Sequence, residues 1–400
     1  MKRLRLLGGT PARTESLPQW PELNEQDAIE LAELISTGPW ALGQTGNAPE
    51  GKHKALFEQL FAQLCDRRFA LAVSSGTTAL DLAVVALELS PGGHIVAANY
   101  GHPSTVHQAA QSHRLLLLDV DSETLCLDPQ QLAIVLNREV RCVITTHFAG
   151  QPGSIEQLRT LCTEARVPLI EDASHAHGAM VGQRPAGSFG ELGCFSLHAT
   201  KNLPAGEGGV IVTDDPDLYD RLWRAHDIGR NRGHIAYDFA ALGGNYRMSE
   251  IHALLALAML PKLKPQIELC MARAAALKER LDRTGVIELL PVQVGVTRHS
   301  YHLLVGRYRP ERCQGLSRRR FVLALCGEGI PCNFGWPAPL SELSFLKSVV
   351  EKHPTPVTDK AVHETVWLDR RLLLVPDGVD QIVEAIEKIQ AHAGALGGNR

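Results

Sequence analysis

The amino-acid sequence predicts an α/β fold whose central sheet is mostly parallel. Its 400 residues are too many for one ordinary hydrophobic core, so two domains are expected. From Arg68 onward, short apolar runs alternate with segments in which apolar residues recur at helical spacing. Continuous apolar strands separated by helices are typical of a parallel sheet that is covered on both faces.

The expected elements follow one another in a regular order. Strands are expected at 69–73, 95–97, 115–120, 140–145, 167–170 and 209–212. Helices are expected at 77–89, 104–112, 128–136, 155–165 and 216–224. A long helix at 249–281, kinked by Pro261 and Pro265, leads into a smaller α+β unit indicated by the segments 301–305, 318–326 and 381–392. We therefore expect a large domain with an N-terminal arm at 1–260 and a small C-terminal domain at 261–400.

Composition narrows the class of protein. Apolar residues make up 44% of the chain and charged residues 21%, which is typical of a globular protein. A net charge of −4 gives no electrostatic reason to expect a nucleic-acid partner. No apolar run is long enough to span a membrane, and the one after the basic start is too short for a signal peptide. Nine singly scattered cysteines favour reduced, mostly buried thiols, so we expect a soluble cytoplasmic protein.

A lysine and an aspartate suggest the chemistry. Lys201 sits in the run 194–202, before the glycine-rich segment 206–209, and Asp172 ends an apolar run upstream. A lysine can form a Schiff base with pyridoxal 5′-phosphate (PLP), and a carboxylate can hold the proton on the pyridine nitrogen of PLP. A lysine near a glycine-rich turn is usually a solvated surface charge. The residues around Lys201 must therefore show whether it is catalytic.

The segment Ser74–Leu80 links an expected strand to an expected helix. Free backbone N–H groups and small hydroxyl residues at a helix N-terminus form an anion site that suits a phosphate. The simpler alternative is an ordinary helix cap made by Ser75 or Thr77.

Asp172 stands at the carboxyl end of a buried strand, where open α/β sheets bind their ligands. A buried aspartate needs a cation or a hydrogen-bond donor, which the protonated pyridine nitrogen of PLP would supply. Two alternatives are a helix-capping role and a metal site formed by Asp172, His175 and His177. No third ligand cluster or HExxH spacing accompanies these residues, so a metal is not predicted.

Six segments in register resemble the DegT/DnrJ/EryC1/StrS aminotransferases, the sugar-aminotransferase branch of the fold-type I PLP enzymes. The resemblance covers nearly the whole chain, from about residue 20 to about residue 389. Its specific parts are 75–77, 171–173, 193–196, 200–202, 206–209 and 245–250. It implies a large PLP-binding domain and a smaller C-terminal α+β domain.

The resemblance implies a role for each matching residue. Lys201 would hold PLP covalently and then move a proton between the amino carbon and the cofactor carbon. Asp172 would pair with the pyridine nitrogen. The Ser196 hydroxyl and the backbone amides of Gly76 and Thr77 would hold the phosphate.

Further implications concern the ring and a second subunit. His175 matches the position, three residues after the aspartate, where relatives carry Gln or His beside the PLP ring. The asparagine that matches Asn245 reaches the phosphate of the neighbouring subunit's cofactor in this family. The resemblance therefore implies a homodimer with shared active sites.

One position departs from the family pattern. Relatives usually stack an aromatic residue on the PLP ring, and a count without gaps places that position on Gly101, between Tyr100 and His102. Either the turn shifts so that Tyr100 or His102 stacks on the ring, or that face is open for an unusual substrate.

The ends of the chain resemble the inosose aminotransferase and aminohydroxybenzoate synthase subgroup, which acts on free cyclic ketones. Relatives often carry two histidines where Asp369 and Arg370 stand here. The resemblance implies transfer of an amino group from glutamine or glutamate to a cyclitol, sugar or related ring ketone in natural-product biosynthesis. The alternatives are a PLP-dependent lyase or dehydratase, and a PLP protein of this family that does not aminate.

Overall fold

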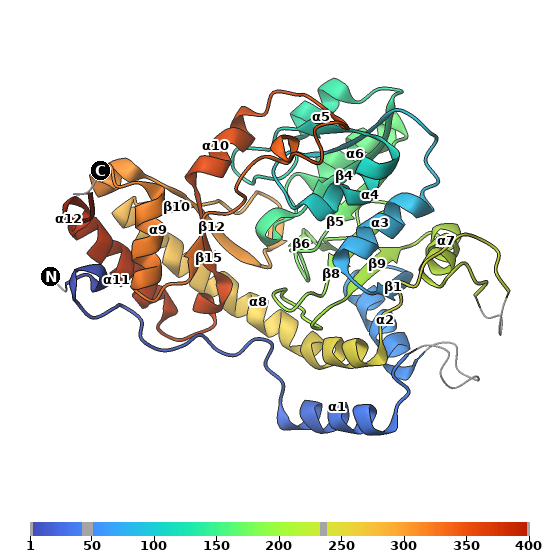
Figure 1. Cartoon of the computed structure of the whole chain (residues 1–400), viewed down its shortest axis with the longest axis horizontal. Helices are drawn as coiled ribbons and strands as arrows, with labels where there is room; N and C mark the ends of the chain where they lie inside the picture. The colour runs from blue at the N-terminus through green and yellow to red at the C-terminus, as the bar shows by residue number, and fades with distance from the viewer. Residues whose placement is uncertain (1–2, 42–50, 233–237, 398–400) are drawn as a thin grey trace.

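The computed structural model describes residues 3–41, 51–232 and 238–397 (Figure 1). Its largest element is an eight-stranded sheet with the order β1-β9-β8-β5-β4-β2-β3-β14. All neighbouring pairs are parallel except those of β9, which runs antiparallel to both β1 and β8. The predicted mostly parallel sheet is confirmed. Its strands are β1 (Phe69–Val73), β2 (His94–Ala98), β3 (Arg114–Leu118), β4 (Val140–Thr146), β5 (Leu169–Asp172), β8 (Leu192–Ser196), β9 (Gly209–Thr213) and β14 (Val350–Glu351).

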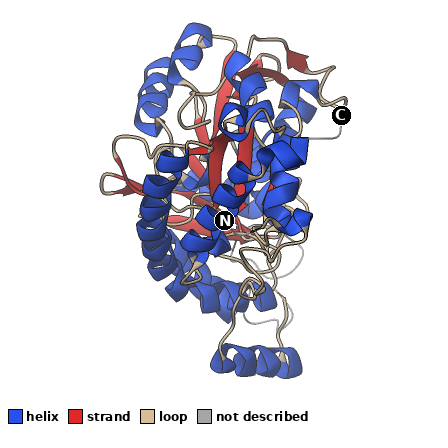
Figure 2. Ribbon diagram, turned by 90° about the vertical axis from the view of Figure 1, so that its left-hand side faces the viewer, coloured by secondary structure: helices blue, strands red, loops and turns tan. Residues whose placement is uncertain are grey.

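Helices cover both faces of this sheet (Figure 2). In β2, Ile95 and Ala97 enter one core and Val96 and Ala98 enter another, as the alternation of side chains along a strand requires. The first core is completed by α3 (Gly76–Ala86), α4 (His107–Ser112) and α7 (Pro216–His226). The second is completed by α5 (Pro129–Val135), α6 (Ile155–Ala165) and α10 (Pro356–Glu364). Burial on both faces explains why the strands are apolar throughout.

The long helix α8 (Glu250–Thr284) joins two parts of the molecule, and Pro261 and Pro265 both lie inside it. Its first half packs with α2 (Lys52–Leu64) and β9, through residues such as Met259. Its second half, including Cys270, enters the core of a smaller unit. The expected domain boundary at residue 260 therefore falls within a helix that serves both cores.

The smaller unit is built on a four-stranded antiparallel sheet with the order β10-β12-β15-β13. Its strands and principal helices are β10 (Ile287–Leu289), β12 (Leu303–Tyr308), β13 (Cys332–Asn333), β15 (Thr365–Asp369), α9 (Arg318–Gly327) and α11 (Gly378–Ala391). Two segments show that the large and small units are not separated at a single point in the sequence. Leu4, at the start of the N-terminal arm, is buried in this smaller core, and β14 returns to pair with β3 of the large sheet.

The remaining elements are peripheral. A three-stranded sheet has the order β11-β6-β7. Among the described residues, the other elements are α1 (Glu25–Thr37), β6 (Met180–Val181), β7 (Arg184–Pro185), β11 (Val296–Arg298) and α12 (Ala393–Gly397). The short 3-10 helices there are η1 (Arg5–Leu7), η2 (Pro103–Val106), η3 (Phe148–Gly150), η4 (Pro310–Cys313), η5 (Leu340–Glu342) and η6 (Arg370–Leu373). Within the described ranges, no helix has both the length and the apolar character needed to cross a bilayer. All nine cysteines are free, and seven of them are buried.

Candidate active site

A cavity of about 400 Å³ lies beyond the carboxyl ends of β4, β5 and β8. Residues far apart in the sequence meet there because parallel strands end at the same edge of the sheet. Of the residues expected from the sequence, seven line this cavity: Gly76, Thr77, His102, Asp172, His175, Ser196 and Lys201.

One end of the cavity is the N-terminus of α3. Ser75 caps this helix, since its hydroxyl accepts a hydrogen bond of 3.1 Å from the Thr78 amide. The amides of Gly76 and Thr77, at the first positions of the helix, have no acceptor within it. A Cβ atom at Gly76 would lie 2.5 Å from the Cβ of Ser196. Glycine therefore lets the helix N-terminus approach Ser196 closely, and the segment combines the expected cap with an anion site.

Asp172, the last residue of β5, is buried with only 4% of its surface exposed. Its Oδ2 accepts hydrogen bonds from the hydroxyls of Thr105 (2.7 Å) and Thr146 (3.4 Å). Its Oδ1 accepts one from the Ser174 amide (3.2 Å). These neutral donors orient the carboxylate without cancelling its charge, so it can still pair with a cation in the cavity.

Lys201 lines the same cavity. Burial lowers the pKa of its ammonium group to about 8, although the Asp172 carboxylate opposes this shift. A lysine with this pKa is neutral in roughly one molecule in ten at pH 7, far more often than a solvated lysine. Its backbone carbonyl accepts a hydrogen bond of 3.2 Å from the indole of Trp20. Lys201 therefore has an amine that is partly neutral at pH 7 and a backbone that is contacted by the N-terminal arm.

Two buried histidines face each other in this cavity. The rings of His175 and His302 have centroids 4.4 Å apart. Burial, and next the positive charge of Lys201, hold the pKa of both imidazoles well below the usual range. Both rings are therefore neutral at pH 7, and each can donate and accept a hydrogen bond.

His177 behaves differently, because neither of its ring nitrogens has a hydrogen-bond partner within the described residues and its ring packs near Phe195. Among the parts of the chain that the structure describes, no group of three or more His, Cys, Asp or Glu side chains could hold a metal ion.

The turn after β2 separates Tyr100 from His102. Tyr100 is 1% exposed, its hydroxyl is hydrogen-bonded to that of Thr365 (3.1 Å), and its ring packs edge-on against Phe148. It does not line the cavity, which corrects the expectation that it contacts the cofactor. His102 does line the cavity, with its ring 5.4 Å from that of Trp336. A Cβ atom at Gly101 would meet only Leu340, at 3.9 Å, so the space beside Gly101 is open.

Asn245 lies on the surface of the single chain, outside the cavity. The next residue, Tyr246, accepts a hydrogen bond of 2.8 Å through its backbone carbonyl from the Ser74 amide. Asn245 is therefore close in the fold to the α3 N-terminus without contributing to its own cavity.

The DegT/DnrJ/EryC1/StrS aminotransferase family model matches residues 40–387. The chain belongs to this family. The putative L-glutamine:3-amino-2,3-dideoxy-scyllo-inosose aminotransferase of Streptoalloteichus tenebrarius is 29% identical, over 98% of this chain and 99% of that protein. The L-glutamine:2-deoxy-scyllo-inosose aminotransferase of Micromonospora echinospora is 26% identical, over the full length of both. The crystal structure of 3-amino-5-hydroxybenzoic acid synthase matches with a TM-score of 0.84 and 25% identity, covering 94% of this chain and 100% of that one.

The chain is thus an aminotransferase of the fold-type I class, as the sequence predicts. Aminotransferases of the DegT/DnrJ/EryC1/StrS family depend on PLP, and the cavity fits that group. The close approach of Gly76 to Ser196 leaves a cradle that fits a phosphate, and within the described ranges the buried Asp172 carboxylate accepts hydrogen bonds from hydroxyl and amide groups but from no cationic side chain. Lys201 places an amine in the same cavity, which is the group that would hold PLP covalently.

In this aminotransferase, Glu171 has a supporting role that the sequence did not reveal. Its carboxylate is fully buried, pairs with His147 (2.7 Å) and accepts hydrogen bonds from the amides of Gly187, Phe189 and Gly190. Burial raises its pKa, but the His147 hydrogen bond and the amides lower it further, so the net shift is downward. Glu171 thereby fixes the strand end that carries Asp172. The adjacent acids Glu171 and Asp172 are visible in the sequence. Only the fold shows that their side chains point to opposite sides of the strand.

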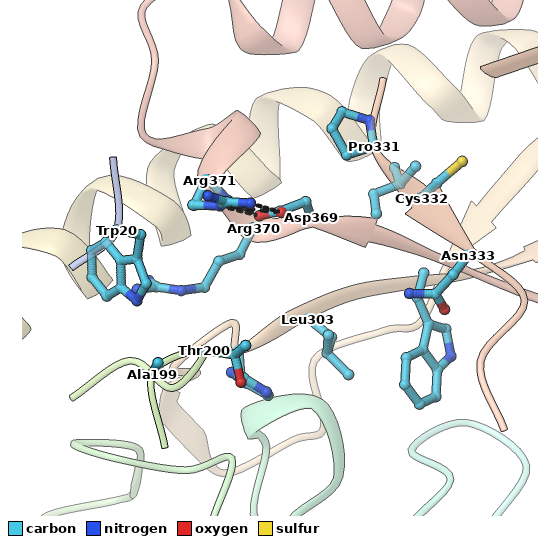
Figure 3. Close-up of a pocket in the computed structure, with 13 residues that line it drawn as sticks. Trp20, Ala199, Thr200, Leu303, Pro331, Cys332, Asn333, Asp369, Arg370 and Arg371 are labelled. Carbon is cyan, nitrogen blue, oxygen red and sulfur yellow. Dashed lines mark hydrogen bonds and ion pairs between the residues drawn. The ribbon is translucent and has the colours of Figure 1, made fainter. Parts of the chain in front are cut away.

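A second cavity, of about 540 Å³, adjoins the first (Figure 3). The two share four lining residues, Thr200, His302, Leu303 and Trp367. Trp367 is buried and forms part of the wall of both cavities. The second cavity is further lined by Trp20 and Arg370, from opposite ends of the chain. It provides further space next to the cavity that Lys201 lines.

Proposed function

We propose that this aminotransferase moves an amino group from glutamine or glutamate to a ketone on a cyclitol, sugar or related ring, in natural-product biosynthesis. The observation that carries this proposal is the meeting of Lys201, Asp172 and the α3 N-terminus around one cavity. The relatives named L-glutamine:inosose aminotransferases, similar over nearly the whole chain, support the choice of donor and acceptor.

Each residue has a defined task in this proposal. When bound, PLP accepts the amino group and takes up the electron pair released at the donor's α-carbon. The Asp172 carboxylate holds the proton at the pyridine nitrogen, and Ser196 with the amides of Gly76 and Thr77 binds the phosphate. The Lys201 amine, neutral in part because of its lowered pKa, takes the proton from the donor's α-carbon and later delivers one to the acceptor carbon.

The second cavity has the chemistry to hold a hydroxylated ring. The neutral His302 imidazole donates from Nδ1 to the Asn202 Oδ1 atom (3.3 Å), which leaves Nε2 free to accept a hydrogen bond from a ring hydroxyl. Trp367, which lines both cavities, meets Trp336 of the first cavity edge to face, 5.0 Å apart, and the pair forms an aromatic wall where the cavities join. A polyhydroxylated ring presents hydroxyls at its edge and C–H groups on its faces, which match this combination.

We also propose a homodimer in which Asn245 completes the active site of the partner subunit. Asn245 is exposed close to the phosphate end of its own cavity but does not line that cavity. The neighbouring Leu242 is 97% exposed and Tyr246 41%, which leaves apolar surface for a second subunit to cover. The free, mostly buried cysteines suit a reducing compartment such as the cytoplasm.

The amino-transfer proposal is tested by absorbance spectroscopy of the PLP-loaded protein. Addition of glutamine or glutamate should replace the absorbance of lysine-bound PLP with that of the amine form of the cofactor. Lys201→Ala should lack the lysine-bound band from the start. A wild-type protein that binds PLP but responds to no amino donor would instead favour a lyase, a dehydratase or a PLP protein that does not aminate.

A further inference from the structure

Arg370 is a buried cation at the wall of the second cavity. It begins η6 directly after β15, and only 4% of its surface is exposed. Among the described residues, neither Nη1 nor Nη2 has a hydrogen-bond partner. Buried polar groups are nearly always paired, so two orphaned guanidinium nitrogens indicate a missing acceptor.

The nearest carboxylate does not satisfy Arg370. Asp369 is engaged by Arg371, whose Nε and Nη2 donate to both of its oxygens at 2.7–3.1 Å. Figure 3 shows this pair, with the Arg370 side chain extending instead toward Trp20. Burial raises the pKa of the adjacent Cys270 thiol, so the thiol stays neutral and cannot balance the charge of Arg370.

Trp20 positions the guanidinium. The central carbon of Arg370 lies 4.4 Å from the centroid of the indole ring, a cation–π contact. The same indole donates its N–H to the backbone carbonyl of Lys201. Trp20 therefore contacts both the charged group of Arg370 and the backbone of Lys201.

We propose that Arg370, supported by Trp20, binds a substrate carboxylate during amino transfer. This inference rests on the proposed function. It identifies a negative charge on the substrate as the feature that the second cavity recognises. A guanidinium presents parallel N–H groups that match the two oxygens of a carboxylate. The carboxylate can come from the amino donor, since glutamine and glutamate both carry one, or from the ring substrate.

Binding of glutarate to the PLP-loaded protein is the direct test. Glutarate has carboxylates but no amino group, so it can occupy the site without reacting. Arg370→Gln should weaken its affinity by about 30-fold or more, as expected when one member of a buried charge pair is removed. Equal affinities in the variant and the wild type would overturn the proposal.

Arg273→Gln is the matched control. Arg273 lies near the same loop, but its guanidinium donates to the backbone carbonyls of Leu373 and Val375 and does not line the cavity. Its loss removes the same charge from the same region and should change glutarate affinity less than about threefold, because its guanidinium is too far from the bound anion to hydrogen-bond it.

Paired ligands identify the source of the carboxylate. L-Glutamine is compared with L-glutaminamide, in which a carboxamide replaces the carboxylate, as donors that convert the cofactor. 3-Amino-5-hydroxybenzoate is compared with 3-aminophenol as aminated rings. In whichever pair has the carboxylate that Arg370 binds, Arg370→Gln should abolish the preference for the carboxylate-bearing ligand over its partner without one. Loss of either preference supports the proposal, and retention of both overturns it.

Thermal unfolding separates binding from a structural role. Replacing an unpaired buried charge with a neutral side chain should leave Tm unchanged or raise it, and glutarate should raise the Tm of the wild type but not of Arg370→Gln. A fall in Tm with unchanged glutarate affinity would overturn the proposal. Glutarate binding needs no turnover, so this result stays informative even if no amino donor reacts and the proposed function fails.

Discussion

The indole nitrogen of Trp20 donates a hydrogen bond of 3.2 Å to the backbone carbonyl of Lys201, across 181 positions of sequence. A residue of the N-terminal arm thus holds the segment that presents the reactive lysine. The lysine's position depends on a contact that no local feature of the sequence reveals.

Trp20→Phe should loosen this segment, because phenylalanine keeps an aromatic face for Arg370 but lacks the N–H. Loss of one hydrogen bond is worth about 1 kcal/mol, so PLP should dissociate roughly fivefold faster. The measurement is PLP release during dialysis. Trp40→Phe is the control, since the Trp40 indole also donates to a backbone carbonyl, that of Leu34, away from the cavity. Equal release rates in both variants would contradict the role of Trp20.

The lowered pKa of Lys201 predicts how PLP capture depends on pH. Only the neutral amine can attack the aldehyde of PLP, so the capture rate should rise with pH and level off above the Lys201 pKa of about 8. The Asp172 carboxylate raises this pKa, so Asp172→Asn should move the midpoint to lower pH. Stopped-flow absorbance of the apoprotein mixed with PLP measures both curves. A wild-type midpoint near the ordinary lysine value would show that burial does not act on Lys201 as described.

Mixed dimers test whether Asn245 serves the neighbouring site. A Lys201→Ala chain keeps Asn245, and an Asn245→Ala chain keeps Lys201. If Asn245 acts across the interface, each mixed dimer contains one intact site, and random mixing should restore about a quarter of wild-type activity. If Asn245 acts within its own chain, isolated mixed dimers will be as inactive as the parents.

The open space beside Gly101 can be filled. Its backbone is not in the left-handed region, and an added Cβ would meet only Leu340 at 3.9 Å, so a Cβ atom is tolerated there. Gly101→Phe should place a ring against the cofactor and slow PLP loss by about fivefold, the ~1 kcal/mol typical of an aromatic contact. Gly101→Ala, which adds only the Cβ, is the control. Equal PLP retention in the two variants would show that the ring finds no partner.

The sequence predicts the parts of this molecule whose signals are local. Continuous apolar runs identified β1 to β5 and β9, and the small residues before α3 indicated both its cap and an anion site. The antiparallel direction of β9 was not predictable, because the same run of apolar residues fits a parallel or an antiparallel strand. Tyr100 and His102 were equivalent in the sequence, and only the turn after β2 directs one to the core and the other to the cavity.

The environment of Arg370 could not be predicted from the sequence, for a different reason. The sequence marked it as a departure from relatives, but its burial, its unpaired nitrogens and its contact with Trp20 depend on packing between opposite ends of the chain. Glu171 likewise could not be separated from Asp172 until the backbone amides that surround it were in place.

The route of the chain between the two cores has a mechanical consequence. Leu4 is buried in the smaller core while Trp20 contacts the lysine segment, α8 passes through both cores, and β14 leaves the smaller unit to join the large sheet. A rotation of one unit against the other would have to deform all of these connections together. Substrate entry and product release should therefore depend on side chains and short loops at the cavity mouth, with the two units keeping one fixed relative orientation through the reaction cycle.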